Sequence, residues 1–276
     1  MSIVTLTSDF GTKDYFVSST KASIINEIKS VNIIDISHQI SPFNITEAAY
    51  ILKNAFKSFP RGSIHIVGVE AELTPENKHV VMKFEDHFFI GANNGIFSMI
   101  LENKKPQEIY EINIHENLIT SFPVLEVFVK VAGHISRGGS LDVIGKKNAT
   151  LKELKNINPV INSNNDQILG SVIYIDNYGN VVTNIKKELF LDVKKNRNYT
   201  IKAGNIKINK INDSYSSAID FSKPKNLRNE DGKKIAIFNK ANHLELSIYK
   251  SNPLTVGSAS SLFGLYFRDP VSIIFE

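Results

Sequence analysis

The first half of the chain alternates between short apolar runs, which are typical of buried strands, and segments with an apolar residue every three or four positions, which are typical of helices. Residues 2–7 are rich in β-branched side chains and end at Asp9 and Gly11, so they predict a buried strand that leads into a loop. Helical periodicity follows over residues 14–29, and residues 31–36 predict a second strand.

The same alternation continues to about residue 140. Asn44, with Glu47 three positions later, predicts a capped helix that runs to about Phe59 and ends at the turn residues that follow. Further elements are a strand over residues 63–69, a hairpin over residues 80–84 and 88–90, and a helix over residues 125–137 closed by two glycines. Such an order predicts an α/β fold, with a mostly parallel sheet covered on both faces, as an N-terminal domain over residues 1–155.

The pattern changes after residue 155. Residues 156–167 are rich in Asn, Pro and Ser and form the expected linker. Strand-like runs then dominate, over residues 171–175, 181–185, 199–202, 206–211, 234–239, 244–249 and 270–275. We expect them to form a small antiparallel barrel or sandwich as a C-terminal domain over residues 168–276, with exposed loops over residues 222–232 and 250–256.

Composition narrows the class of protein. The chain has 276 residues, 42% of them hydrophobic, which suffices for two folded domains. It has no cysteine, and its seven histidines are scattered, so we expect no disulfide and no metal site. No apolar stretch approaches the 18 residues of a membrane span and no leader segment is evident, so we expect a cytoplasmic protein. The net charge of +4 is spread among acidic residues, which favours a solvated surface over nucleic-acid binding.

Asp9 stands where the first strand of an α/β sheet should end, and ligands of such sheets bind outside the carboxyl ends of the strands. A carboxylate there accepts two hydrogen bonds from a ribose diol. The alternative is that Asp9 caps a helix or stabilises its own turn. Asp14 is a weaker candidate, because an acid near the start of a helix is common for electrostatic reasons.

A second candidate segment is the sequence Asp-Asn-Tyr-Gly-Asn at residues 176–180, between two strand-like runs. It predicts a hairpin with Tyr178 and Gly179 at its turn. Asp176, Tyr178 and Asn180 would then present an acid, an aromatic ring and a carboxamide from one tip, which matches an adenosine-like ligand. The alternative is ordinary turn chemistry.

Two other kinds of site have little support. The segment Gly-Ala-Asn-Asn-Gly at residues 91–95 lacks the Lys-Ser/Thr pair of a phosphate loop, so we expect a tight turn into a helix near Ile96. No Gly-x-Ser-x-Gly motif is present and no histidine lies in a nucleophile motif, so covalent hydrolase chemistry is not indicated.

Five segments, taken in order, resemble the S-adenosyl-L-methionine hydroxide adenosyltransferases, also called S-adenosyl-L-methionine hydrolases, which are relatives of the fluorinating and chlorinating enzymes. They are TLTSDFG at residues 5–11, SPFN at 41–44, GANNG at 91–95, IDNYGNVVTNI at 175–185 and GSASSLFGL at 257–265. The resemblance covers nearly the whole chain. It implies an N-terminal α/β domain, a C-terminal β-barrel and a homotrimer whose ligand sites lie between neighbouring subunits.

The resemblance also implies roles for individual residues. Asp9 would accept the ribose diol, and Asp176 would bind the methionine amino group. The other implied ligand contacts are Phe43 near the ligand, Tyr178 and Asn180 at the adenine, backbone groups of Ser258 and Ala259 at the base, and, less securely because of an apparent insertion, Tyr215 and Asn239. S-adenosyl-L-methionine would be a substrate, and no cofactor is implied.

In the hydrolase branch, an Asp, an Arg and a His are thought to orient water for attack on the ribose C5′ carbon. Here Glu70 stands at the Asp position, Asn77 or Lys78 at the Arg position and Pro123 at the His position. Lys78 lacks the planar fork of a guanidinium, and Pro123 cannot donate a proton. Two functions therefore stay open: a hydrolase with a rebuilt water site at Glu70 and Lys78, or a module that only binds the nucleoside. Halide transfer is disfavoured, because Val124 replaces the halide-contacting serine of the relatives.

Overall fold

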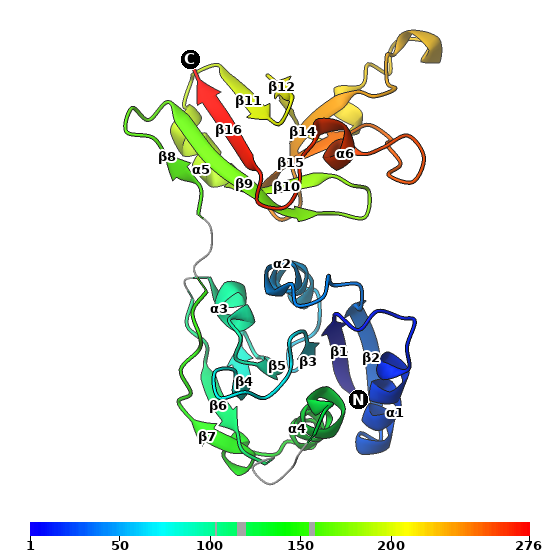
Figure 1. Ribbon diagram of the computed structural model, residues 1–276, viewed down its shortest axis with the longest axis vertical. Helices are drawn as coiled ribbons and strands as arrows, with labels where there is room; N and C mark the ends of the chain where they lie inside the picture. The colour runs from blue at the N-terminus through cyan, green and yellow to red at the C-terminus, as the bar shows by residue number, and fades with distance from the viewer. Residues whose placement is uncertain (103, 115–119, 155–157) are drawn as a thin grey trace. The chain divides into compact units, whose positions relative to one another are not determined.

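The computed structural model of the chain describes residues 1–102, 104–114, 120–154 and 158–276. The chain forms two compact units, each one continuous stretch: Met1–Lys155, the N unit, and Asn156–Glu276, the C unit (Figure 1). The expected domain limit at residue 155 and the first two residues of the expected linker lie outside the described residues.

The N unit contains a seven-stranded sheet, half parallel and half antiparallel. In spatial order its strands are β2 (Val31–Ser37), β1 (Ser2–Ser8), β3 (Ile64–Gly68), β5 (His87–Ala92), β4 (His79–Phe84), β6 (Glu108–Ile112) and β7 (Gly145–Lys147). The pairs β2–β1, β1–β3 and β3–β5 are parallel, and the remaining neighbours are antiparallel. Glu85 and Asp86 both have positive φ, which is the geometry of a tight two-residue turn between β4 and β5.

Helices cover both faces of this sheet, as expected for an α/β domain (Figure 1). On one face α1 (Phe16–Glu27) packs against α4 (Val129–Ser136), which continues the π-helix η1 (Val124–Phe128). On the other face α2 (Ile45–Phe56) packs against α3 (Ile96–Leu101). A short 3-10 helix, η2 (Leu141–Val143), comes directly before β7 in the chain. The two faces bury separate apolar clusters, one around Leu6 and Phe128 and one around Leu52 and Phe89.

The cap predicted for α2 is present. The Asn44 side chain accepts a hydrogen bond from the Glu47 N–H at 3.1 Å. The Glu47 carboxylate does not close a standard capping box, because it accepts from the Ser41 N–H at 3.0 Å and from the Asn44 amide at 3.2 Å. This arrangement fixes the loop before α2, which carries Phe43.

The C unit is a curled, barrel-like sheet, which confirms the predicted fold class. Its strands in spatial order are β12 (Ile206–Ile208), β11 (Tyr199–Ala203), β16 (Pro270–Phe275), β9 (Gln167–Ile175), β10 (Val181–Lys186), β15 (His243–Ile248), β14 (Lys234–Phe238) and β13 (Ile211–Asn212). All neighbouring pairs are antiparallel except β13–β14, and β12 contacts β14 across the opening. The inner face buries one apolar cluster that includes Phe190, Leu246 and Phe263.

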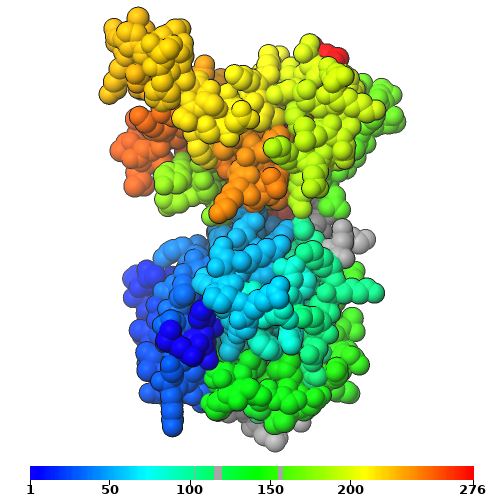
Figure 2. Space-filling view, turned by 180° about the vertical axis from the view of Figure 1, so that it is seen from behind, coloured from blue at the N-terminus to red at the C-terminus, as the bar shows by residue number. Residues whose placement is uncertain are grey.

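Several parts of the C unit differ from the expectation. Two helices were not predicted, α5 (Lys187–Lys194) and α6 (Ala259–Phe263), and the expected linker contributes a short strand, β8 (Val160–Ile161), which pairs with β9. The segment between β13 and β14 holds only two 3-10 turns, η3 (Ser216–Ala218) and η4 (Lys225–Leu227), and it protrudes from the unit (gold in Figure 2). Within the described ranges, no helix has the length and apolar character needed to cross a membrane.

Candidate active site

The predicted ligand residues of the N unit lie on one edge of its sheet. The parallel strands β1, β2, β3 and β5 all end there, and each is followed by a loop. Asp9 and Asp14 lie in the first of these loops, Phe43 in the second, and Glu70 and Lys78 in the third. Because ligands of open α/β sheets bind at this carboxyl edge, the position of these residues fits a ligand site.

Asp9 and Phe43 are in direct contact. The Phe43 N–H donates to Asp9 Oδ2 at 2.9 Å, and no described residue donates a hydrogen bond to Asp9 Oδ1. The Phe43 side chain is 72% exposed, and its φ of 62° lies in the left-handed region, which is unusual for a bulky residue. One carboxylate oxygen is thus fixed by the neighbouring loop, while the other is open to a ligand.

Asp14 is exposed and makes no hydrogen bond or ion pair with a described residue. It precedes Tyr15, the N-cap residue of α1, so it lies outside the first helical turn. Asp14 therefore neither caps the helix nor contacts Asp9, so neither role explains an acidic residue at this position. Its ligand role stays a prediction.

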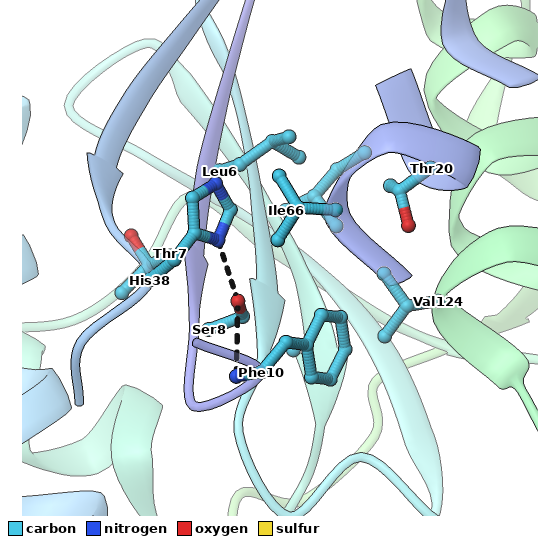
Figure 3. A pocket seen from close by; sticks show the side chains of 10 residues that line it. Leu6, Thr7, Ser8, Phe10, Thr20, His38, Ile66 and Val124 are labelled. Carbon is cyan, nitrogen blue, oxygen red and sulfur yellow. Dashed lines mark hydrogen bonds between the residues drawn. The ribbon is translucent and has the colours of Figure 1, made fainter. Parts of the chain in front are cut away.

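Two polar residues beside Asp9 were missed in the sequence. Ser8 and His38 are both buried, and Ser8 Oγ lies 2.6 Å from His38 Nδ1 (Figure 3). The other ring nitrogen of His38, Nε2, lies 3.1 Å from Asp35 Oδ1, and the Lys21 ammonium lies 2.5 Å from Asp35 Oδ2. Burial of Asp35 opposes ionisation, but the hydrogen bonds from Lys21 and His38 lower the pKa of this carboxyl below its ordinary value. The sequence signal was two polar residues at adjacent strand ends, Ser8 on β1 and His38 after β2.

A small cavity lies beside Ser8, with an aromatic wall behind it. The Phe10 ring points toward Val124 in the cavity (Figure 3), and it packs against Phe16 and Phe122 with ring centroids 5.9 and 5.4 Å away. Gly68 is required here, because a Cβ on it would lie 2.9 Å from the Phe10 ring. The cavity has room for about one water molecule.

The structure does not pair the two predicted catalytic residues, since no ion pair joins Glu70 to Lys78 among the described residues. Glu70 is partly buried and has a φ of 44°, and Lys78 is exposed. Asn94 fixes the loop that carries Glu70, because the Asn94 side-chain amide donates to the carbonyls of Val69 and Glu70 at 3.0 and 3.3 Å. The left-handed backbone at Glu70 is a local strain of the kind that gathers at functional sites.

A second cation reaches the same loop from a distant segment. The Lys152 ammonium donates to Asn77 Oδ1 at 3.0 Å, and Asn77 is buried. Asn93 joins the two segments, since its side chain accepts from the Lys152 N–H at 2.8 Å and donates to the Thr150 carbonyl at 2.8 Å. The segment at residues 91–95 thus forms the expected tight turn into α3, and its asparagines hold the loops around it.

In the C unit, the hairpin tip between β9 and β10 is fixed by Asp176. Its Oδ1 accepts from the N–H groups of Tyr178 and Asn180 at 2.9 and 2.8 Å, and its Oδ2 accepts from the Asn180 side chain at 2.9 Å. The predicted turn was wrong by one residue: the Gly179 N–H donates to the Asp176 carbonyl at 2.8 Å, so Asn177 and Tyr178 are the central pair. Gly179, with a φ of 71°, follows the turn. Tyr178 is 66% exposed at this tip.

Tyr215 and Asn239 meet at a buried carboxylate that the sequence analysis missed, Glu245 on β15. The Tyr215 hydroxyl donates to Glu245 Oε1, the Ser247 hydroxyl donates to the same oxygen at 3.0 Å, and the Asn239 amide donates to Oε2 at 3.2 Å. Burial, the hydrogen bond to Glu245 and the negative charges of Glu245 and Asp176 raise the pKa of Tyr215. Since the Asp176 charge acts on Tyr215, this cluster and the hairpin tip are close together.

Ser258 and Ala259 lie against the same hairpin. The Ser260 N–H donates to the Gly179 carbonyl at 2.9 Å, and a Cβ on Gly179 would lie 2.2 Å from the Ser258 side chain. Ser258 also caps α6, where its own N–H donates to Ser261 Oγ at 2.8 Å. The C unit therefore gathers all its predicted ligand residues around one tip, although the Ser258 N–H already has an acceptor.

The chain matches two family models and several known proteins along its length. It matches the models of the S-adenosyl-L-methionine (SAM) hydroxide adenosyltransferase N-terminal domain over residues 4–145 and C-terminal domain over residues 170–272. It is 31% identical to the (R)-S-adenosyl-L-methionine hydrolase of Methanocaldococcus jannaschii, over 100% of this chain and 97% of that protein. It is 22% identical to the fluorinase of Nocardia brasiliensis, over 67% of this chain and 71% of that enzyme.

A solved structure agrees with these matches. The crystal structure of an uncharacterized conserved protein from Thermotoga maritima superimposes with a TM-score of 0.81 at 26% identity, covering 99% of both chains. Both family models, the full-length relative and the two-unit fold point to the same conclusion. The chain belongs to the SAM hydroxide adenosyltransferase family.

Proposed function

We propose that this protein hydrolyses S-adenosyl-L-methionine to adenosine and L-methionine. The observation that carries the proposal is the 31% identity with an (R)-S-adenosyl-L-methionine hydrolase over the whole chain. The two clusters of predicted ligand residues support it: a half-open carboxylate at the carboxyl edge of the N unit, and an acid, ring and carboxamide tip in the C unit.

In this proposal each unit binds a different part of the substrate. Asp9 accepts the ribose hydroxyls with its open oxygen, with Phe43 beside it and Asp14 nearby in the same loop. Asp176 binds the amino group of the methionine. The adenine and the atoms next to it are surrounded by the other predicted ligand residues of the C unit: Tyr178, Asn180, Ser258, Ala259, Tyr215 and Asn239. We also propose a cytoplasmic homotrimer in which the two clusters that meet belong to neighbouring subunits. Light scattering that gives about three times the 30.9 kDa of one chain would support the assembly.

The reaction is a displacement at the ribose C5′ carbon. The oxygen of water forms a bond to C5′, the C5′–sulfur bond breaks, and the sulfonium takes that electron pair and leaves as neutral methionine. Glu70 accepts the proton that water loses, and Lys78 or Lys152 supplies positive charge to the same loop. In-line positioning and a pocket that excludes bulk water supply much of the rate, without a covalent intermediate.

Water is favoured over halide as the nucleophile because of Val124. This residue lines the cavity near Phe10, is 2% exposed and presents only methyl groups. A bound halide needs hydrogen-bond donors to replace its hydration, and a valine side chain has none.

The test is an assay of the purified protein with S-adenosyl-L-methionine, followed by chromatography of the products. We expect adenosine and methionine in equal amounts, and no halogenated nucleoside when chloride or fluoride is added. A protein that binds the substrate but forms no adenosine above the blank would instead be a binding module. The variant Glu70→Gln should lower the turnover number and leave binding unchanged.

A further inference from the structure

We propose that His38 is a positioning residue for Asp9, which it holds in the orientation that binds the ribose diol. The inference rests on the proposed function only in taking Asp9 as the diol acceptor. It assigns a role in the site to residues of the second strand and the loop after it, which are not expected to contact the ligand themselves.

The residues around Asp9 are tied to one segment from both sides. Before Asp9, the Ser8 hydroxyl lies 2.6 Å from His38 Nδ1. After it, the Gly11 N–H donates to the His38 carbonyl at 2.8 Å, and Asp9 itself accepts from the Phe43 N–H at 2.9 Å. His38 therefore makes two of the contacts that fix this loop, and its neighbour Gln39 adds a third, from its side-chain amide to Thr12 Oγ1 at 3.3 Å.

The orientation of the His38 ring is itself fixed. The ring is buried and faces Ser8 with Nδ1 (Figure 3), while its Nε2 lies 3.1 Å from Asp35 Oδ1. Ser8 Oγ also accepts weakly from the Phe10 N–H at 3.5 Å, so its own hydrogen is free to point at Nδ1. Nε2 then carries the ring hydrogen, and the Asp35 carboxylate 3.1 Å away favours this tautomer by its charge, although the angle of a hydrogen bond is not met.

Packing alone does not hold Ser8 in place. The small cavity beside Ser8 leaves one side of its side chain without close neighbours. A serine at the edge of such a cavity depends on its hydrogen bond for a single orientation. Loss of that bond would allow the end of β1, and with it the Asp9 carboxylate, to move.

Three substitutions separate the contacts of His38. Ser8→Ala removes the hydroxyl, and His38→Gln keeps a polar atom near the position of Nε2 but loses the one at Nδ1. His38→Asn does the reverse and keeps a polar atom that faces Ser8. We expect the first two to weaken binding of adenosine about fivefold, and His38→Asn to retain most of it.

The chain offers a matched control on the same strand. Thr5 Oγ1 lies 2.7 Å from His65 Nδ1, another buried hydroxyl–imidazole contact, away from the Asp9 loop. Thr5→Val should lower the free energy of unfolding as Ser8→Ala does and leave the affinity for adenosine unchanged. The control separates a general loss of stability from a loss of positioning.

The readout is calorimetric titration of the whole protein with adenosine and with 2′,3′-dideoxyadenosine, which lacks the diol. Wild type should prefer adenosine, and Ser8→Ala and His38→Gln should reduce that preference by lowering only the adenosine affinity. In an Asp9→Ala background, Ser8→Ala should cause no further loss. The inference is overturned if both nucleosides weaken equally, if affinity does not change, or if the loss persists without Asp9. None of these titrations requires turnover, so failure of the hydrolase assay is a separate result.

Discussion

At Asp176 the structure confirms the turn interpretation, which does not conflict with a ligand role. The sequence left open whether it serves the turn or a ligand, and the structure shows that it accepts three hydrogen bonds within its own hairpin. Those bonds use both oxygens of the carboxylate and present Asn180 and Tyr178 in fixed positions. The hydrogen bonds of the turn therefore fix the hairpin tip in one conformation. A ligand role for Asp176 stays a prediction.

At Tyr215 we predict an effect on stability. Tyr215→Phe removes a hydroxyl donor from the buried Glu245 carboxylate, which leaves a charged group with less hydrogen bonding. We expect the C unit to lose about 1–3 kcal/mol in free energy of unfolding, measured by urea titration. Tyr266→Phe is the matched control, since this tyrosine is 66% exposed in the same unit and its hydroxyl bonds to no described residue. Equal unfolding midpoints for the two variants would contradict the assigned contact.

The sequence offered candidate site residues where a local signal existed. Asp9 and the 176–180 tip follow strands directly, so their place at an element end was readable. Ser8 with His38 was missed because the partners are 30 positions apart, and Lys152 was missed because Asn77 is 75 positions away. Glu245 looked like one polar residue in an apolar strand, and only the fold brings Tyr215 to it.

Among the elements, the first five strands and the longer helices of the N unit were predicted closely, whereas β6, β7 and the helices of the C unit were missed. Residues 187–194 form eight helical residues directly after a strand, too few for a clear period. The helix at residues 259–263 is shorter still, with only five residues, two of them serines, which have lower helix propensity than alanine. Its signal was a cap, since Ser258 and Ser261 form a capping box.

The hairpin tip gives a prediction at this scale. Gly179→Ala should destabilise the C unit by more than about 1 kcal/mol, because the added Cβ meets both a positive φ and the Ser258 side chain at 2.2 Å. Gly264→Ala is the control, with a φ of 65° and nothing within 4 Å of the added atom. Thermal unfolding should separate the two, and an equal loss would show that the Ser258 contact is unimportant.

For the molecule as a whole, a buried pair of histidines links stability to pH. His65 Nε2 lies 3.1 Å from His87 Nδ1, under the rings of Phe56 and Phe89. Burial, followed by the charge on His87, lowers the pKa of His65 from 6.5 to about 3. Burial also lowers the pKa of His87. Both rings are therefore neutral in the folded protein. If both facing nitrogens carried a hydrogen, the two N–H groups would point at each other and neither would have an acceptor.

The sign of the pH dependence follows. Below pH 6.5, His65 becomes protonated in the unfolded chain but not in the folded protein. The contribution of His65 to the free energy of unfolding is therefore complete above pH 6.5 and is lost progressively toward pH 3. At pH 5 we expect a loss of about 2 kcal/mol from His65 in the N unit. Urea titrations of wild type and His65→Gln at pH 7.5 and 5 measure it. A variant with the same difference between the two pH values as wild type would refute the assignment.

Each unit is one uninterrupted stretch of polypeptide, and the chain passes between them once, near residue 155. A single recombination event at that junction would therefore transfer the complete proposed set of ribose-binding or base-binding residues between genes of the family. In the proposed function the first stretch binds the nucleophile and the second binds the nucleobase, so both preferences could diversify by exchange of whole units.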